Sequence, residues 1–147
     1  MKHLIFIFLS LCASVALAQS SIEKYLYHQA VVKNANTDEI VEDFGYGNKG
    51  IIIYYEKNGK EWISVSIGAE EVYSIKVVQT IDDYPLANIK VEMKKGAVMK
   101  DGSPVGAIAV FRIFDLAKNK NTPEMIRTQI MESSVAFEFE GIISIND

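Results

Sequence analysis

The residues of this chain that could do chemistry are few, and most of them are acidic. The chain contains one cysteine, Cys12, and two histidines, His3 and His28, against 19 Asp and Glu residues. A catalytic zinc site needs about three protein ligands, and a Ser-His-Asp triad needs a histidine beside an activated serine. No Gly-x-Ser-x-Gly turn surrounds any serine. We therefore expect no catalytic residue, metal site or cofactor, and we predict that the protein is not an enzyme.

The carboxylates occur in three runs that could in principle bind a cation or form an acid pair. None matches the Asp-x-Asp-x-Asp-Gly pattern of a calcium loop. A glycosidase brings together two acids from distant segments, which clustering in sequence does not show. We interpret the runs as solvated turns and strand ends, and rank a carboxylate-based hydrolase third among the possible functions. A weak surface metal contact stays open if the first run is helical, because Asp38 and Glu42 would then be one turn apart. The runs are Asp38, Glu39, Glu42 and Asp43; Glu70 and Glu71; and Asp82 and Asp83.

The first 18 residues have the pattern of a secretory signal peptide. Lys2 precedes an apolar run over residues 4–15, and small residues stand at Ala16 and Ala18 before Gln19. The run is too short to span a bilayer. We expect cleavage before Gln19, which leaves residues 19–147 as a single all-β domain. That domain should be exported, soluble, periplasmic or extracellular, and without a transmembrane segment.

Cleavage would remove Cys12, so the remaining chain must be held together by its core, without disulfides. It would carry 14 basic and 19 acidic residues, a net charge of −5. This mild acidity argues against nucleic acid as a partner, because nucleic-acid binding requires a basic face.

The segment from Ile51 to Ile67 predicts a β-hairpin, because two β-rich runs flank Asn58-Gly59. A two-residue loop would place Lys57 opposite Lys60 and Glu56 opposite Glu61, and like charges in opposite positions are unfavourable. We therefore prefer a three-residue loop, Lys57 to Gly59, with Gly59 in a bulge.

In the preferred register Tyr54 faces Trp62, and Ile53 faces Ile63. One face is then apolar through Ile51, Ile53, Tyr55, Ile63, Val65 and Ile67, interrupted by Glu61. The other face carries Ile52, Tyr54, Trp62, Ser64 and Ser66. Aromatic residues on a half-polar face are typical of both a stabilising cross-strand pair and a ligand platform. As candidate ligand-binding residues we name Trp62, Tyr54 and Tyr46, the last from the glycine-rich loop before the hairpin.

Alternating patterns predict strands over most of the remaining chain. Residues 20–33 fit either a strand or a helix, and their Tyr and Val content favours a strand. Residues 40–44 fit a short strand or one helical turn. Residues 70–81 predict a long strand that ends in a turn at 82–85, and residues 87–94 predict another with Ile89, Val91 and Met93 inward. Turns are expected at 95–96 and 100–104.

Three segments complete the chain. Val105 to Phe114 is apolar apart from Arg112, which predicts a central strand covered on both sides. Thr122-Pro123-Glu124 resembles a helix start, so we predict the only helix over Pro123 to about Glu132. Residues 135–140 and 142–145 predict closing strands around Gly141.

These elements predict an all-β fold with one late helix, as an antiparallel β-sandwich or an up-and-down barrel of about 7–9 strands. The order of elements resembles that of lipocalin-like barrels, which carry small apolar ligands. The resemblance is architectural, because the N-terminal Gly-x-Trp signature of those proteins is missing and the sole tryptophan, Trp62, lies in the central hairpin. We assign the chain to no family on this basis.

Two functions are compatible with these observations. The first is a non-catalytic binding module for a small apolar molecule, a glycan or a peptide segment. The alternative is an envelope or extracellular protein-protein interaction protein without a small-molecule ligand, binding by its sheet surface or by strand addition.

Overall fold

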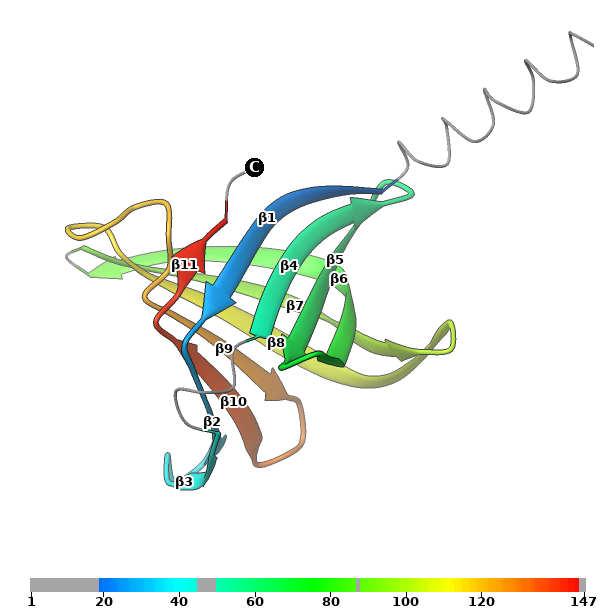
Figure 1. Ribbon diagram of the computed structural model, residues 1–147, viewed down its shortest axis with the longest axis horizontal. Coiled ribbons are helices and arrows are strands. Elements are labelled where there is room, and N and C mark those ends of the chain that lie inside the picture. Colours follow the sequence, from blue (N-terminus) through cyan, green and yellow to red (C-terminus); the bar gives the residue numbers. More distant parts are fainter. Residues whose placement is uncertain (1–18, 45–49, 87, 146–147) are drawn as a thin grey trace, which may run out of the picture.

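A computed structural model describes residues 19–44, 50–86 and 88–145, which form one antiparallel sheet of 11 strands (Figure 1). The predicted all-β class is confirmed. The strand number exceeds the predicted 7–9, and the sheet is not closed, so the predicted sandwich or barrel is not confirmed. The strand order is β11-β1-β4-β5-β6-β7-β8-β9-β10-β2-β3. The strands are β1 (Gln19–Tyr27), β2 (Gln29–Asn34), β3 (Ile40–Asp43), β4 (Gly50–Lys57), β5 (Lys60–Ile67), β6 (Glu70–Leu86), β7 (Ile89–Lys100), β8 (Ser103–Asp115), β9 (Met125–Ile130), β10 (Val135–Glu140) and β11 (Ile143–Ser144).

The two ends of the sheet adjoin at His28. This residue alone separates β1 from β2, yet β1 pairs with β4 and β2 pairs with β10, toward opposite ends of the strand order. Chain continuity therefore forces the sheet to curl, and in Figure 1 β1, β4 and β5 arch over β7, β8 and β9. The His28 amide donates a hydrogen bond of 3.0 Å to the Glu140 carbonyl at this junction.

The core fills the concave side of the curled sheet. The rings of Tyr25 and Tyr54 meet edge to face at 5.9 Å, and those of Tyr27 and Phe139 pack at 4.7 Å. The Tyr27 hydroxyl donates a hydrogen bond of 2.6 Å to the Ser66 carbonyl, and burial raises the pKa of Tyr27 to about 12. Buried aliphatic residues from six strands complete this core, namely Ala30, Ile52, Ile63, Val65, Ile75, Ile108, Val110 and Ile126.

The predicted register of the central hairpin is wrong. The turn has two residues, with Asn58 and Gly59 at φ of 53° and 73°, so Glu56 pairs with Glu61 and Lys57 with Lys60. Each like-charge pair gains a favourable contact with a third residue. Lys94 of β7 binds Glu61 at 2.8 Å, and Lys57 lies 5.8 Å from the ring of Trp62 in the same hairpin.

The one-residue change of register reverses the face of β4. Ile52 and Tyr54 point into the core with Ile63 and Val65. Ile51, Ile53 and Tyr55, which the predicted register placed on one apolar face with Ile63 and Val65, point outward. Tyr54 therefore faces Ile63, and Trp62 faces Tyr55.

The predicted helix from Pro123 to about Glu132 is also wrong, because β9 occupies residues 125–130. Ile126 and Ile130 are four residues apart, a spacing that fits both a helix face and a strand face. Pairing with β8 on one side and β10 on the other satisfies the backbone of β9, and this decides between the two periods. No residue of the described part of the chain is helical.

The long hairpin of β6 and β7 differs from the prediction in two ways. β6 continues to Leu86, through the predicted turn at 82–85, and β7 continues to Lys100, through the predicted turn at 95–96. The inward face of β7 is also the opposite of the predicted one: Glu92 and Lys94 are 8 % and 7 % exposed, whereas Val91 and Met93 lie on the outer face.

Several predicted strands are confirmed. Residues 20–33 lie in β1 and β2, residues 40–43 form β3, and the closing strands are β10 and β11. β8 is central, between β7 and β9, but it is covered only in part, since Val105 is 62 % exposed and Ile108 is buried. The predicted signal peptide lies outside the described residues. Within the described part of the chain, no helix is long and apolar enough to cross a membrane.

Candidate functional site

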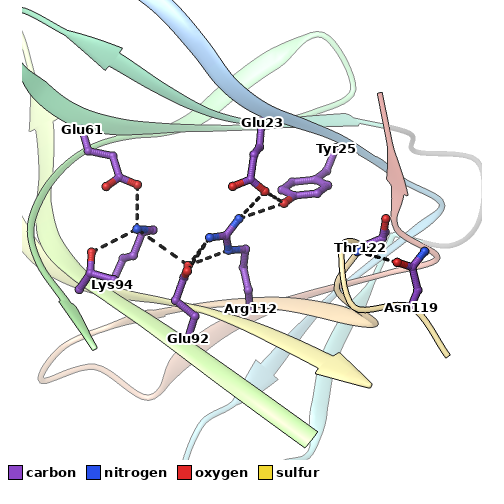
Figure 2. A network of polar contacts seen from close by, with 9 residues as sticks. Glu23, Tyr25, Glu61, Glu92, Lys94, Arg112, Asn119 and Thr122 are labelled. Carbon is purple, nitrogen blue, oxygen red and sulfur yellow. Dashed lines mark hydrogen bonds and ion pairs between the residues drawn. The ribbon is translucent and has the colours of Figure 1, made fainter. Parts of the chain in front are cut away.

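A network of charged side chains lies on the concave face, at the end of the sheet where β8 finishes (Figure 2). Its centre is Arg112, whose Nε and Nη2 donate to the two carboxylate oxygens of Glu92 at 2.7 and 2.6 Å. The two residues pair directly across β7 and β8. This two-point contact between planar groups is the strongest common form of ion pair.

The remaining donors of Arg112 reach across the concave side to β1. Its Nη1 lies 2.7 Å from a Glu23 oxygen and 2.9 Å from the Tyr25 hydroxyl, which itself donates to Glu23. The Tyr54 ring of β4 packs under the guanidinium, with the central carbon 4.4 Å from the ring centroid. Arg112 therefore connects the two walls of the curled sheet by charge, hydrogen bonds and a cation-π contact.

Lys94 extends the network toward β5 and β6. Its ammonium group lies 2.8 Å from Glu61, 3.9 Å from Glu92 and 3.1 Å from the Thr80 hydroxyl. The side chains of Glu23 and Glu61 are 37 % and 29 % exposed, so the network meets solvent at these two carboxylates.

The environment favours the charged forms of Glu23 and Arg112. Burial opposes ionisation of Glu23, but hydrogen bonds from Tyr25 and Arg112 and the charge of Arg112 outweigh it and lower the pKa of Glu23. Burial raises the pKa values of Tyr25 and Tyr54. Burial opposes the charge of Arg112, but its bonds to Glu92 raise the Arg112 pKa. Glu23 and Arg112 in their charged forms, beside Tyr25 and Tyr54 in their neutral forms, are suited to holding structure or orienting charges, rather than to moving protons.

Among the described residues, two buried hydroxyl groups on the concave side have no hydrogen-bond partner. They are the Tyr54 hydroxyl and the Thr128 hydroxyl, each about 1 % exposed by residue. Unpaired buried hydroxyl groups commonly mark positions of internal water.

A groove of about 410 Å³ lies at the other end of the long strands, across β6, β7 and β8. Ser74, which lines the groove, lies on the outer face of β6 between the buried residues Tyr73 and Ile75, and it pairs with Ser64 of β5. The lining mixes apolar residues, both charges and hydroxyl groups: Glu71, Val72, Ser74, Val98, Met99, Lys100, Asp101 and Val105.

An aromatic pair stands beside this groove. Tyr55 and Trp62 face each other across β4 and β5, with ring centroids 6.4 Å apart and planes 20° from parallel. A hydrogen bond joins Tyr55 to Ser74 of the groove. Ser64 lies two residues from Trp62 on the same face. Its hydroxyl donates a hydrogen bond of 2.6 Å to Glu71, another lining residue. The aromatic pair and the groove therefore form one continuous surface, which we call the outer groove.

Two of the three candidate ligand-binding residues lie on opposite faces of the sheet. Trp62 lies on the outer face beside the groove, Tyr54 lies 1 % exposed in the core under Arg112, and Tyr46 is outside the described residues. Sequence reasoning missed Tyr55 because of the wrong hairpin register. It also missed Glu92 and Lys94, although the charged residue at every second position of residues 90–94 was a visible signal.

The acidic runs do not assemble a metal site within the described residues, where no group of three or more His, Cys, Asp or Glu residues is placed to hold an ion. Asp38 instead lies 3.7 Å from Lys33 and 3.8 Å from Arg127. Glu42 is in β3, so the helical spacing that would have placed it one turn from Asp38 does not occur.

Comparisons with protein-family models, with curated proteins and with solved structures each find no match to this chain.

Proposed function

We propose that the protein is an exported, non-catalytic binding module that holds a glycan or a peptide segment in the outer groove. The observation that carries this proposal is the groove of about 410 Å³ beside the Tyr55–Trp62 pair, a volume typical of ligand sites. The mixed lining favours these polar ligands over a small apolar molecule, because Glu71, Lys100 and Asp101 would lose water without gaining partners.

The chemistry of the groove suits a ligand with one apolar and one polar face. The rings of Tyr55 and Trp62 offer flat apolar surface, on which the C–H face of a sugar or an apolar side chain can stack. Glu71 keeps a second oxygen that can accept a hydrogen bond while the first accepts from Ser64. The charged network on the concave face supports this site by fixing the curvature of the sheet.

Intrinsic fluorescence tests the proposal directly, because Trp62 is the only tryptophan in the chain. Soluble oligosaccharides and a mixture of short peptides would be titrated separately while the Trp62 emission is recorded. We expect one of the two classes to shift or quench the emission in a saturable way. Glu71→Gln and Lys100→Met should weaken that binding about tenfold each, as expected for one lost charged hydrogen bond. Lys60→Met, at the hairpin turn, is the matched control and should not change it.

Trp62→Ala separates a binding role from a packing role. We expect loss of ligand binding by calorimetry with only a modest decrease in the free energy of unfolding, because Trp62 is on the outer face. If the variant does not fold, Trp62→Phe keeps the ring and should retain weaker binding. Wild-type affinity in either folded variant would place the ligand elsewhere.

Export rests on the signal-like pattern of residues 1–18 and has its own test. Intact-mass analysis of the protein from the exported fraction should show a chain that starts at Gln19. Native mass spectrometry of the same sample would reveal a retained ligand or a multiple of the chain mass. A full-length chain that stays in the cytoplasm would contradict the exported part of the proposal.

A second candidate function, a protein-protein interaction protein, is favoured by the edge strand β3. All four residues of β3 are exposed, including Ile40 at 58 % and Val41 at 69 %, and β3 ends the strand order. An exposed edge with apolar side chains can accept a strand from another protein. Val41→Lys should abolish capture of such a partner and leave fluorescence titrations at the groove unchanged.

A further inference from the structure

Where β7 runs beside the end of β8, charged side chains lie on the inner face of the sheet and apolar side chains lie on the outer face. On the concave face of β7 and β8 lie Glu92, Lys94 and Arg112. On the convex face, direct cross-strand pairs form two adjacent rows, Ile81–Met93–Phe111 and Val91–Ile113–Met125. We call these six residues the apolar outer face.

The apolar outer face keeps surface open to solvent. Ile81 is 36 % exposed, and the other five members are half-buried against one another. Ile89, which lies nearby but is not a member, is 42 % exposed. Among the described elements, β7 and β8 make most of their contacts with the strands that lie next to them in the sheet. Soluble monomers rarely expose contiguous apolar rows of this kind, and such rows usually mark an interaction surface.

Charges border the apolar outer face with a definite polarity along the strands. At one border Lys95 lies at the next outward position of β7 after Met93, and Arg127 lies beside Phe111. Arg127 is already paired with Glu138 at 3.0 Å, so Lys95 carries the positive charge of this border. At the other border Asp83, Asp115 and Glu140 lie beside or beyond the second row. Asp83 and Lys95 form no ion pair with another described residue, so both charges are available to a partner.

We propose that the apolar outer face binds a second copy of this chain in a two-fold symmetric dimer. For two sheets packed face to face, the two-fold axis lies in the plane between them. An axis that runs across the strands, between the two rows, places the first row of one copy over the second row of the other. It also places the basic border of each copy over the acidic border of the other, so the surface is complementary to itself in both apolarity and charge.

The dimer is weak and reversible. Because two convex surfaces touch over a limited area, we expect each copy to bury less than the roughly 800 Å² per partner of a standard interface. We expect a dissociation constant of about 10 µM, which corresponds to a small but specific contact. This inference does not depend on the outer groove, which lies toward the other end of β6, β7 and β8.

Sedimentation velocity between about 1 and 200 µM tests the dimer, and it should show a monomer that becomes a dimer as concentration rises. Met93→Gln with Ile113→Thr removes apolar surface while keeping strand-compatible side chains, and should weaken association at least tenfold. Unchanged Trp62 emission and circular dichroism would show that this variant is folded. A wild-type protein that is monomeric over the whole range would overturn the proposal.

A charge exchange tests the orientation of the two copies. Lys95→Glu should weaken the dimer about tenfold, because the substituted border would face the acidic border of the partner. Adding Asp83→Lys should recover most of the loss, whereas Lys60→Glu, a reversal at the hairpin turn, should have no effect. Equal weakening by Lys95→Glu and Lys60→Glu would rule out this arrangement, since only net charge would then matter. Association that is unchanged by Lys95→Glu would rule it out as well.

Discussion

At the scale of single residues, Arg112 has the largest structural role. It is 6 % exposed, bonded to Glu92 and Glu23 from opposite walls of the sheet, and stacked on Tyr54. A buried charge of this kind is retained only when its partners satisfy it, because taking it from water is costly. Because these residues satisfy one another, replacing any one of them leaves the charges of the remaining residues without a partner.

Arg112→Met should therefore lower the free energy of unfolding by roughly 3–5 kcal/mol, because it leaves the Glu92 carboxylate buried without its partner. The double variant Arg112→Met with Glu92→Leu should regain most of that loss, since it removes both charges. Urea unfolding of the two variants and the wild type would measure the difference. A double variant as unstable as the single one would mean that the contact with β1 matters more than the pairing with Glu92.

The lowered pKa of Glu23 predicts how this residue contributes to stability with pH. A carboxyl group whose pKa falls on folding stabilises the protein above its unfolded pKa, near 4.5, and this contribution is lost as pH falls through the folded pKa. Wild type should exceed Glu23→Gln in thermal midpoint at pH 7, and this difference should shrink as the pH falls below 4.5 and through the folded pKa of Glu23. A difference that does not shrink on acidification would show that the hydrogen-bond geometry, rather than the charge, is responsible.

At the scale of elements, turn geometry determines which faces of the strands are buried. The two-residue turn at Asn58-Gly59 sets the register of β4 and β5, and through it the inward direction of Tyr54 and the outward direction of Tyr55. The outer groove and the concave network both depend on this one turn.

Gly59→Val should destabilise the protein by about 1–3 kcal/mol, because a β-branched residue is strained at a φ of 73°. Gly106→Ala in β8 is the control, since its added methyl would meet no atom within 4 Å and needs no positive φ. Thermal unfolding would compare the two. A midpoint for Gly59→Val equal to that of the control would mean that the turn can adopt another form.

At the scale of the whole molecule, stability should be graded across the sheet. The central strands contribute the buried residues Ile63, Ile75 and Ile108, whereas β3 is exposed throughout and β11 has two residues. The ends of the sheet are connected by the bend at His28.

Hydrogen exchange should reflect this gradient. Amides of β5 and β8 should exchange only by global unfolding, whereas those of β3 and β11 should exchange at least about 100-fold faster, because edge strands open locally. Mass spectrometry of exchanged peptides would measure both. Strong protection of β3 at low protein concentration would contradict its assignment as an open edge.

Local patterns determined much of this protein from the sequence alone. The all-β class followed from alternation and turn residues, and most strands appear where Tyr, Ile and Val alternate with polar residues. The hairpin at Asn58-Gly59 was predictable because these residues accept positive φ, and Trp62 was a natural candidate for a surface site. Export and the function of the groove remain proposals that the sequence suggested.

Only the tertiary structure decided register, direction and pairing, because these depend on partners that are distant in the sequence. Like charges at Glu56 and Glu61 argued against the true turn until Lys94, more than 30 residues away, supplied the missing partner. The spacing of apolar residues within 125–130 fits a helix, but pairing with β8 on one side and β10 on the other makes this segment a strand. Alternation in β7 shows two faces but not which one is inside, and the contacts of Arg112 and Lys94 across the curled sheet turn the charged face inward.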